Sequence, residues 1–269
     1  MDPAVQFPDP VIDRLEMLWG DGFLSPGGPV EVHEIVAGLD LRGKRILDIG
    51  CGTAGPAIVL AAELGAGEVV GLDIEARLLD RAARHVERAS LARRIRLQLV
   101  EPGQPLPFPD GSFDVVFSKD SIFHIADKQG LFGEVARLLP PTGVFAASDW
   151  LAHEDACAMP QFARYVELRE LKVAMVTAAR MKALMRQAGL RQITALDRSA
   201  EYADLLRADA ERIDGPLRSR LAAAMGADRL ARWERLRRAC AEAVRCGGLR
   251  PTRLRGHSPK GPAQMDKAF

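Results

Sequence analysis

Three closely spaced glycines, Gly50, Gly52 and Gly55, lie in the first quarter of the 269-residue chain. They follow a short apolar run of the kind that forms buried parallel strands, and glycines at such a place let the backbone turn tightly and approach a ligand. Asp73 lies about 20 residues past this run, where a carboxylate meets a ribose in nucleotide-binding units. The spacing predicts a nucleoside cofactor site.

Two groups able to handle protons lie farther along, in the run from Ser118 to Ile125. Asp120 and His124 are four residues apart, so their side chains share a face if this loop is helical. An imidazole titrates near neutral pH, which makes His124 a candidate catalytic base. Simpler roles stay open at this point, because His124 could cap the following helix and Asp120 could be an ordinary loop carboxylate.

Apolar runs that fit strands alternate with amphipathic runs that fit helices, which indicates a parallel sheet with helices on both faces. The expected strands lie at 45–49, 68–72, 95–100, 113–117, 143–150, 191–196 and 248–254. The last of them is expected to be antiparallel. We therefore predict an α/β fold with a doubly wound, seven-stranded, mostly parallel sheet and a helical cap.

Ligands in doubly wound sheets bind at the carboxyl ends of the strands, near the point where the strand order reverses. This rule places Gly50, Asp73, Glu101 and Ser118 around one crevice. The glycine-rich run 20–28, which also contains Phe23 and Ser25, is predicted to be a mobile flap over the ligand. An ordinary turn before the next helix is the alternative interpretation of that run.

Two features select the cofactor. Asp48 stands inside the first strand, where a nicotinamide site has an apolar residue, and its carboxylate suits an ammonium and a sulfonium. A Pro-Phe-Pro-Asp-Gly-Ser-Phe-Asp run precedes the fourth strand. With these motifs the chain resembles the class I S-adenosylmethionine-dependent methyltransferases and their Rossmann-like fold over residues 41–150. The resemblance implies a cofactor site formed by Asp48, Gly50, Cys51, Gly52, Asp73, Ile74, Glu101 and Ser118.

A closer resemblance, to the phosphoethanolamine N-methyltransferases, rests on Phe-Leu-Ser-Pro-Gly-Gly at 23–28 and on Ser-Lys-Asp-Ser-Ile-Phe-His-Ile at 118–125. It implies that Asp120 holds the amine and that His124 accepts its proton. The implied substrate residues are Phe23, Ser25, Trp150 and Arg169, with Arg169 on the phosphate. The family uses tyrosines for the histidine partner and the phosphate, but this chain has tyrosine only at 165 and 202 and has Leu171 and Trp150 at two of those places.

The acceptor therefore stays open among several small polar metabolites. Phosphoethanolamine or a related amine is the first expectation, and C- or O-methylation of an amino acid, a keto acid or a natural-product intermediate is the alternative. Two other function classes are also compatible with a glycine loop. A nicotinamide oxidoreductase would bind NAD, and a silent sensor would bind S-adenosylmethionine without methylating anything.

The bulk composition excludes several partners. Lys and Arg total 37 against 36 Asp and Glu, and this balance favours neither nucleic acid nor an anionic membrane. No apolar run has the length of a membrane span, so we expect a cytoplasmic monomer or homodimer that acts on a small-molecule substrate. Four cysteines without metal-ligand spacing predict free thiols and no metal.

Five regions follow from these patterns. The residues 1–40 are expected to form N-terminal helices and the flap, 41–150 the cofactor-binding core, and 151–176 a helical cap. The residues 177–255 complete the sheet with helical additions, and 256–269 form a disordered tail.

Overall fold

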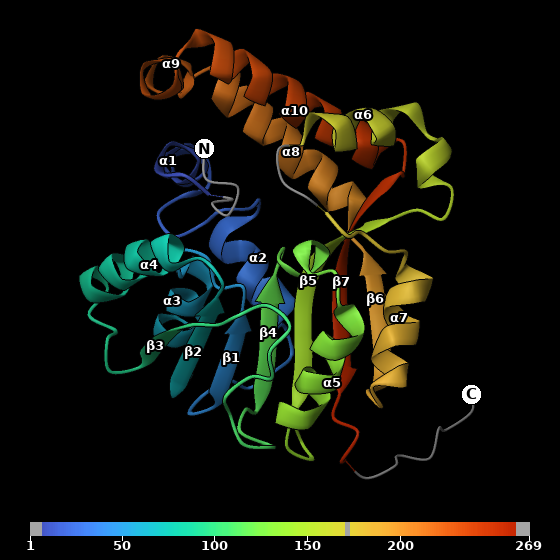
Figure 1. Ribbon diagram of the computed structural model, residues 1–269. Helices are drawn as coiled ribbons and strands as arrows, with labels where there is room; N and C mark the ends of the chain where they lie inside the picture. The colour runs from blue at the N-terminus through green and yellow to red at the C-terminus, as the bar shows by residue number, and fades with distance from the viewer. Residues whose placement is uncertain (1–6, 170–172, 262–269) are drawn as a thin grey trace.

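The computed structural model describes residues 7–169 and 173–261, and its centre is one seven-stranded sheet (Figure 1). The strand order is β3-β2-β1-β4-β5-β7-β6. The strands are β1 (Arg45–Ile49), β2 (Glu68–Asp73), β3 (Ile95–Leu99), β4 (Val115–Lys119), β5 (Val144–Ala152), β6 (Arg191–Asp197) and β7 (Leu249–His257). The pairs among β1 to β5 are parallel, and β7 is antiparallel to both of its neighbours. The predicted fold class is confirmed.

Helices cover both faces of the sheet because successive strand residues point to opposite sides. Leu47 belongs to the core cluster on one face, which also contains residues of α5 (Lys128–Leu138) and α7 (Ala178–Gln187). Its neighbour Ile46 belongs to the cluster on the other face, with residues of α2 (Gly28–Ile35), α3 (Gly55–Ala62) and α4 (Ala76–Arg88). Continuous apolar strands are thus explained by burial on two sides.

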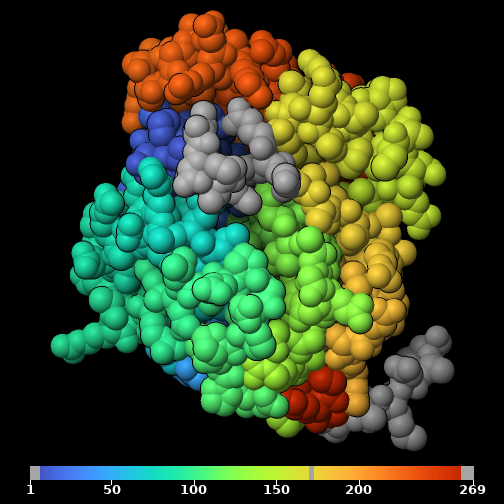
Figure 2. All heavy atoms as spheres, in the orientation of Figure 1, coloured from blue at the N-terminus to red at the C-terminus, as the bar shows by residue number. Residues whose placement is uncertain are grey.

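A second layer of helices lies over the carboxyl ends of the strands (Figure 1). It contains α6 (Pro160–Leu168), α8 (Ser199–Asp214), α9 (Arg218–Met225) and α10 (Ala227–Arg245), while α1 (Asp9–Trp19) packs against α8 and α9 from the N-terminal side. Figure 2 shows α9 and α10 in orange, directly above the blue α1. In the two described ranges, 7–169 and 173–261, none of the helices has both the length and the apolar character of a membrane span.

Three details differ from the sequence-based expectations. The sequence pattern predicts one helix over 198–225, but α8 ends at Asp214, where Gly215 and Pro216 interrupt the helical hydrogen bonds before α9. The loop after β4 is not an α-helix, since only Ile122–His124 forms a short 3-10 turn, η1. Residues 256 and 257 extend β7 instead of starting a disordered tail, because they pair with β5.

The helical cap expected over 151–176 forms only part of the layer of helices over the sheet. The segment 151–176 contains the short turn η2 (Ala156–Ala158) and helix α6, and α6 packs on α10. Leu171 and the tail residues 262–269 lie outside the described residues. Much of the layer over the sheet comes from α8, α9 and α10, which the chain inserts between β6 and β7.

The aromatic pair Phe132 and Phe145 fixes α5 on the sheet, and both side chains are fully buried with ring centroids 5.6 Å apart. We expect Phe132→Ala to lower the free energy of unfolding by about 3–5 kcal/mol, because it removes a buried ring and leaves a cavity. Denaturant titration would measure the loss. Leu196→Ala, at a side chain that is 55% exposed on β6, is the control and should change stability little.

Candidate active site

A cavity of about 970 Å³ opens at the carboxyl ends of β1, β2 and β4. Its walls come from the glycine loop after β1, the flap 20–28, the loop after β4, and helices α1, α6 and α10. The cavity thus joins segments that are far apart in the sequence, in the place that doubly wound sheets reserve for ligands. Cys51, Gly52, Asp73, Ile74 and Glu101 line one half of it.

Asp48 lies behind this half with its carboxylate almost completely buried. Neither oxygen has a hydrogen-bond partner among the described residues. Burial, reinforced by the charge of Asp73, raises the pKa of Asp48 from 3.8 to about 8. A buried carboxylate without a partner is costly, and a ligand ammonium placed beside it would restore the ionised form.

Asp73 ends β2 and accepts two backbone hydrogen bonds, from Gly52 N and Glu75 N, each of 3.0 Å. Burial raises the pKa of Asp73 although these bonds act in the opposite direction. Each carboxylate oxygen keeps a second lone pair that can accept from a ribose hydroxyl. The next residue, Ile74, is 50% exposed and presents an apolar side chain to the same cavity.

The glycine loop is tightly packed from both sides. Gly50 has a φ of 71°, and a Cβ atom there would lie 1.8 Å from Ser121 Oγ. Gly55 donates to Gly22 O at 2.9 Å, and a Cβ on Gly55 would lie 2.5 Å from that oxygen. Only glycine fits these two positions, so the loop, the flap and the segment after β4 are held in contact.

The residues of this half fit the expected cofactor. The unpartnered Asp48 suits an amino group, Asp73 suits ribose hydroxyls, and Ile74 suits an apolar ring face. Cys51 is buried, and burial raises the pKa of its thiol, which argues against a nucleophilic role. Over residues 7–169 and 173–261 there is no cluster of three or more His, Cys, Asp or Glu side chains that could hold a metal ion.

Asp120 lines the other half of the cavity. Its backbone is left-handed, with a φ of 52°. Its Oδ2 pairs with Lys119 Nζ at 3.0 Å, and its Oδ1 accepts from Ser148 Oγ at 3.4 Å. Glu31 is also buried here, and burial together with the charge of Asp120 raises its pKa to about 7. Strained backbone and buried charge are both typical of functional sites.

His124 follows in η1, and its ring lies 4.0 Å from the Phe123 ring, centroid to centroid. No α-helix joins Asp120 and His124, so the shared helical face considered from their spacing does not form. Instead Lys128 holds the loop, because its Nζ donates to Ile125 O at 2.7 Å and to Ala174 O at 2.6 Å. His124 lines the cavity, and the Lys128 bonds hold the loop that carries it.

Arg169 follows the last turn of α6 and faces the same half of the cavity. Its guanidinium lies 5.0 Å from the centroid of the Phe123 ring and donates to the Tyr165 hydroxyl. Its Nε is buried without a hydrogen-bond partner, and no carboxylate in the described part of the chain pairs with it. An arginine in this state is ready to bind an anionic group.

The structure gathers most of the predicted site residues at the cavity. Phe23, Ser25, Trp150 and Arg169 line it with Asp120 and His124. Asp48 and Ser118 are the exceptions. The Asp48 carboxylate is buried behind the cofactor half, and the Ser118 hydroxyl is fully buried and donates to Ile49 O at 2.8 Å, which joins β4 to β1. The side chain of Ser118 therefore holds the sheet together and does not reach the cofactor half.

Sequence reasoning missed several residues that line the cavity, namely Lys119, Tyr165, Trp233 and Arg237. Arg237 lies 5.0 Å from the centroid of the Trp19 ring and pairs with Asp209 at 2.8 Å. From the sequence, the arginines that crowd the C-terminal part of the chain are compatible with a solvated helix face and with neutralisation of an acidic substrate. Lys119 did leave a signal, since a charge at the end of a buried strand needs a partner.

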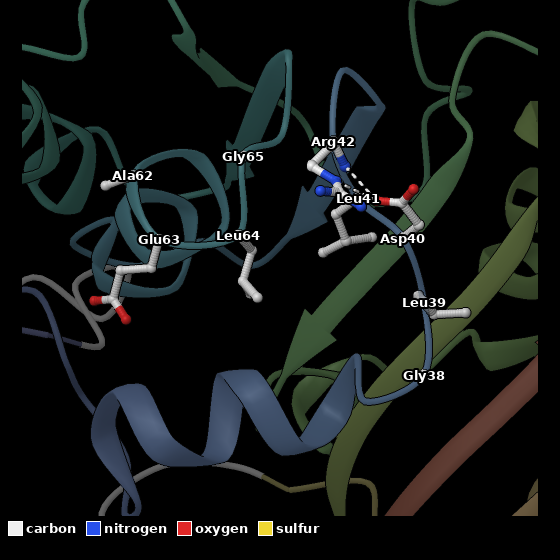
Figure 3. A pocket seen from close by; sticks show the side chains of 9 residues that line it. All are labelled: Gly38, Leu39, Asp40, Leu41, Arg42, Ala62, Glu63, Leu64 and Gly65. Atoms are coloured by element: carbon white, nitrogen blue, oxygen red, sulfur yellow. Dashed lines mark hydrogen bonds and ion pairs between the residues drawn. The ribbon is translucent and has the colours of Figure 1, made fainter.

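A second hollow, shown in Figure 3, lies between the loop 38–42 and the end of α3 at 62–65. Both segments are at the amino-terminal edge of β1, away from the carboxyl ends of the strands. The charged groups Arg42 and Asp40 pair with each other at 3.2 Å and are well exposed. This hollow has no buried polar group comparable with Asp48.

The comparisons with known proteins agree with this geometry. The family model described as a methyltransferase domain matches residues 40–202. Phosphoethanolamine N-methyltransferase 3 of Arabidopsis thaliana is 30% identical over 78% of this chain, which spans 42% of the length of the plant protein. The 27-O-demethylrifamycin SV methyltransferase of Amycolatopsis mediterranei is also 30% identical, over 77% of this chain and 80% of its own length.

Among solved structures, phosphoethanolamine N-methyltransferase 2 of Haemonchus contortus superposes with a TM-score of 0.85. That structure contains phosphomonomethylethanolamine and S-adenosylhomocysteine. The superposition covers 95% of this chain and 59% of the nematode protein at 24% identity, so it bears on the fold.

We expect the affinity for S-adenosylhomocysteine to rise with pH towards about 8, because the ligand ammonium needs the ionised form of Asp48. The rise is at most about tenfold per pH unit. Calorimetry between pH 6 and 8 measures it. Asp48→Asn should bind weakly at every pH.

The same shift affects the ligand-free protein. A raised pKa in the folded state means that the stabilising contribution is present at low pH and is lost as pH rises from about 4 towards 8. Asp48→Asn should flatten this part of the stability profile. An unchanged profile in the variant would remove Asp48 as its cause.

We expect Asp73→Ala to weaken S-adenosylmethionine binding by about 2 kcal/mol through lost ribose hydrogen bonds. Calorimetry at constant pH checks this, with circular dichroism to verify the fold. The matched control is Asp228→Ala, an exposed carboxylate on α10, which should bind normally. Equal affinities for the two variants would contradict the ribose role.

Proposed function

The chain belongs to the S-adenosylmethionine-dependent methyltransferases, and on that premise we propose that it methylates a small polar metabolite, with phosphoethanolamine or a related amine as the first acceptor. The observation that carries this proposal is Arg169, a guanidinium that faces the cavity without a carboxylate partner among the described residues. The name of the plant relative points to the same acceptor class.

The cofactor supplies a methyl group already activated on a sulfonium. The chain therefore has to hold and align the two reactants, and alignment of this kind lowers a barrier by roughly 7–11 kcal/mol. Asp48 would hold the amino end of the cofactor and Asp73 its ribose. The glycine loop would bring the backbone close to the cofactor, and Leu24 of the flap packs over Gly52.

On the acceptor side, three groups have distinct tasks. Arg169 would hold the phosphate, and Asp120 would orient the ammonium through its carboxylate. His124 would take up the proton that the nitrogen must lose before it attacks, a role worth roughly 100- to 10,000-fold in rate. The bonds of Lys128 Nζ to Ile125 O and Ala174 O hold the loop that carries His124, which supports this role.

A second acceptor class is favoured by one observation. Large apolar side chains line the cavity between α1 and α10, including Trp19, Trp233 and Leu236. Phosphoethanolamine has little apolar surface to cover them, whereas a natural-product intermediate does. The name of the Amycolatopsis relative fits this alternative, in which oxygen or carbon is methylated.

A labelled-methyl assay with phosphoethanolamine and a metabolite pool, followed by mass identification of the product, tests the proposal. We expect His124→Ala to lower turnover at least about 100-fold while S-adenosylhomocysteine binds normally. Arg169→Met should raise KM for phosphoethanolamine about tenfold or more. Arg164→Met, on the exposed side of α6, is the matched control.

The outcomes separate the candidates. Methylation of a pool component other than a phosphorylated amine would move the assignment to the second acceptor class. Binding of S-adenosylmethionine with no methylated product in any pool would indicate that the protein is a sensor of this cofactor and not an enzyme. Wild-type kinetics in His124→Ala at every pH would remove this residue from the mechanism.

A further inference from the structure

Lys119 is a buried cation that the chemistry of methyl transfer does not require. It is the last residue of β4, and its side chain is only 2% exposed. An ammonium taken out of water at this depth persists in a fold only when several oxygens surround it. Its partners therefore identify what it does.

Three oxygens surround the Lys119 ammonium, two from the distant flap and one from the next residue, Asp120. Nζ donates to Ser25 Oγ and to Pro26 O in the flap, the second bond being 2.8 Å long. It also donates to Asp120 Oδ2 at 3.0 Å. An ammonium has three N–H donors, so these partners use all of them and leave none for a ligand. Lys119 therefore acts through its neighbours.

The flap is held at its other end by the glycine loop. Gly55 N donates to Gly22 O at 2.9 Å, and Phe23 is buried beside Gly55. The flap thus runs from the cofactor half of the cavity to Asp120, with a fixed contact at each end. Pro26, Lys119 and Asp120 all line the cavity, so the Lys119 bonds set the position of its wall on the acceptor side.

We propose that Lys119 is a positioning residue that ties the flap to Asp120 and so fixes the acceptor site relative to the cofactor site. Its effect on catalysis rests on the proposed methyl transfer. Its effect on the flap does not, and this difference allows the two ideas to be tested separately. A lysine without this role would leave flap motion and acceptor binding unchanged when it is replaced.

The primary experiment is hydrogen exchange of the flap amides in residues 22–28, with and without S-adenosylhomocysteine. In Lys119→Met we expect the flap amides to exchange at least about tenfold faster than in the wild type. The methionine side chain is similar in length to lysine but makes none of the three hydrogen bonds. Ser25→Ala, which removes one bond and keeps the ion pair, should give a smaller increase. Lys119→Arg should restore part of the protection through its charge.

Lys44→Met is the matched control, because Lys44 pairs with Asp114 at 3.4 Å near the amino-terminal edge of β1. It should leave flap exchange as in the wild type. In kinetics with the acceptor found for the wild type, Lys119→Met should raise the acceptor KM more than it lowers kcat. Lys119→Arg should recover part of this KM.

Two results would overturn the proposal. One is flap exchange equal to that of the wild type in both Lys119→Met and Ser25→Ala. The other is faster flap exchange that leaves the acceptor KM unchanged. If Lys119→Met does not fold, flap exchange in Ser25→Ala decides whether the proposal holds, since this variant removes only the hydrogen bond between Lys119 Nζ and the Ser25 hydroxyl. If no acceptor is found, the exchange data still test the tie between the flap and Asp120.

Discussion

The parallel pairing of β1 with β4 is the constraint on which the site depends. These strands are neighbours in the sheet although β2 and β3 lie between them in the chain, and Asp48 is in register with Phe117. The chain leaves β1 towards one edge and β4 towards the other, so a crevice opens between their carboxyl ends. The glycine loop follows β1 and the Lys119–Asp120 segment ends β4, so the parallel pairing of these two strands places both segments at the same edge of the sheet.

Charge is distributed unequally across this crevice. On the cofactor side, Asp48 is a buried carboxylate without a partner, while on the acceptor side Arg169 is a guanidinium without a carboxylate among the described residues. Between them, Lys119 and Asp120 neutralise each other. An ammonium beside Asp48 would favour its ionised form, and an anionic group would pair with Arg169, so these two groups suit a cationic amine at one end and an anionic group at the other. A preorganised arrangement of this kind lowers the cost of binding, since the protein groups need little reorientation.

The parts of the site that the sequence predicted are those encoded in contiguous residues. The strand, the glycines and Asp73 form one unit of local structure, and local spacing determines their geometry. Lys119 could not be assigned its partners in this way, because Ser25 is 94 residues away. The bond of the Ser118 hydroxyl could not be predicted for a related reason, since strand alternation permits either face and only the packed sheet shows this hydroxyl on Ile49 O. The arginine-rich helices stayed open between a solvated face and a substrate contact, because only the packed fold shows which helix face meets the cavity.

The helices α8, α9 and α10 form one excursion that leaves the sheet after β6 and returns at β7. Every strand pairing closes outside this excursion, so its residues can change in number and type while the sheet keeps its register. Its helix α10 supplies Trp233, Leu236 and Arg237 to one wall of the cavity, whereas the glycine loop and Asp73 belong to the sheet and its turns. Exchanging α10 would therefore change the apolar wall of the cavity and leave Asp120, His124 and Arg169 in place, since these three lie outside the excursion.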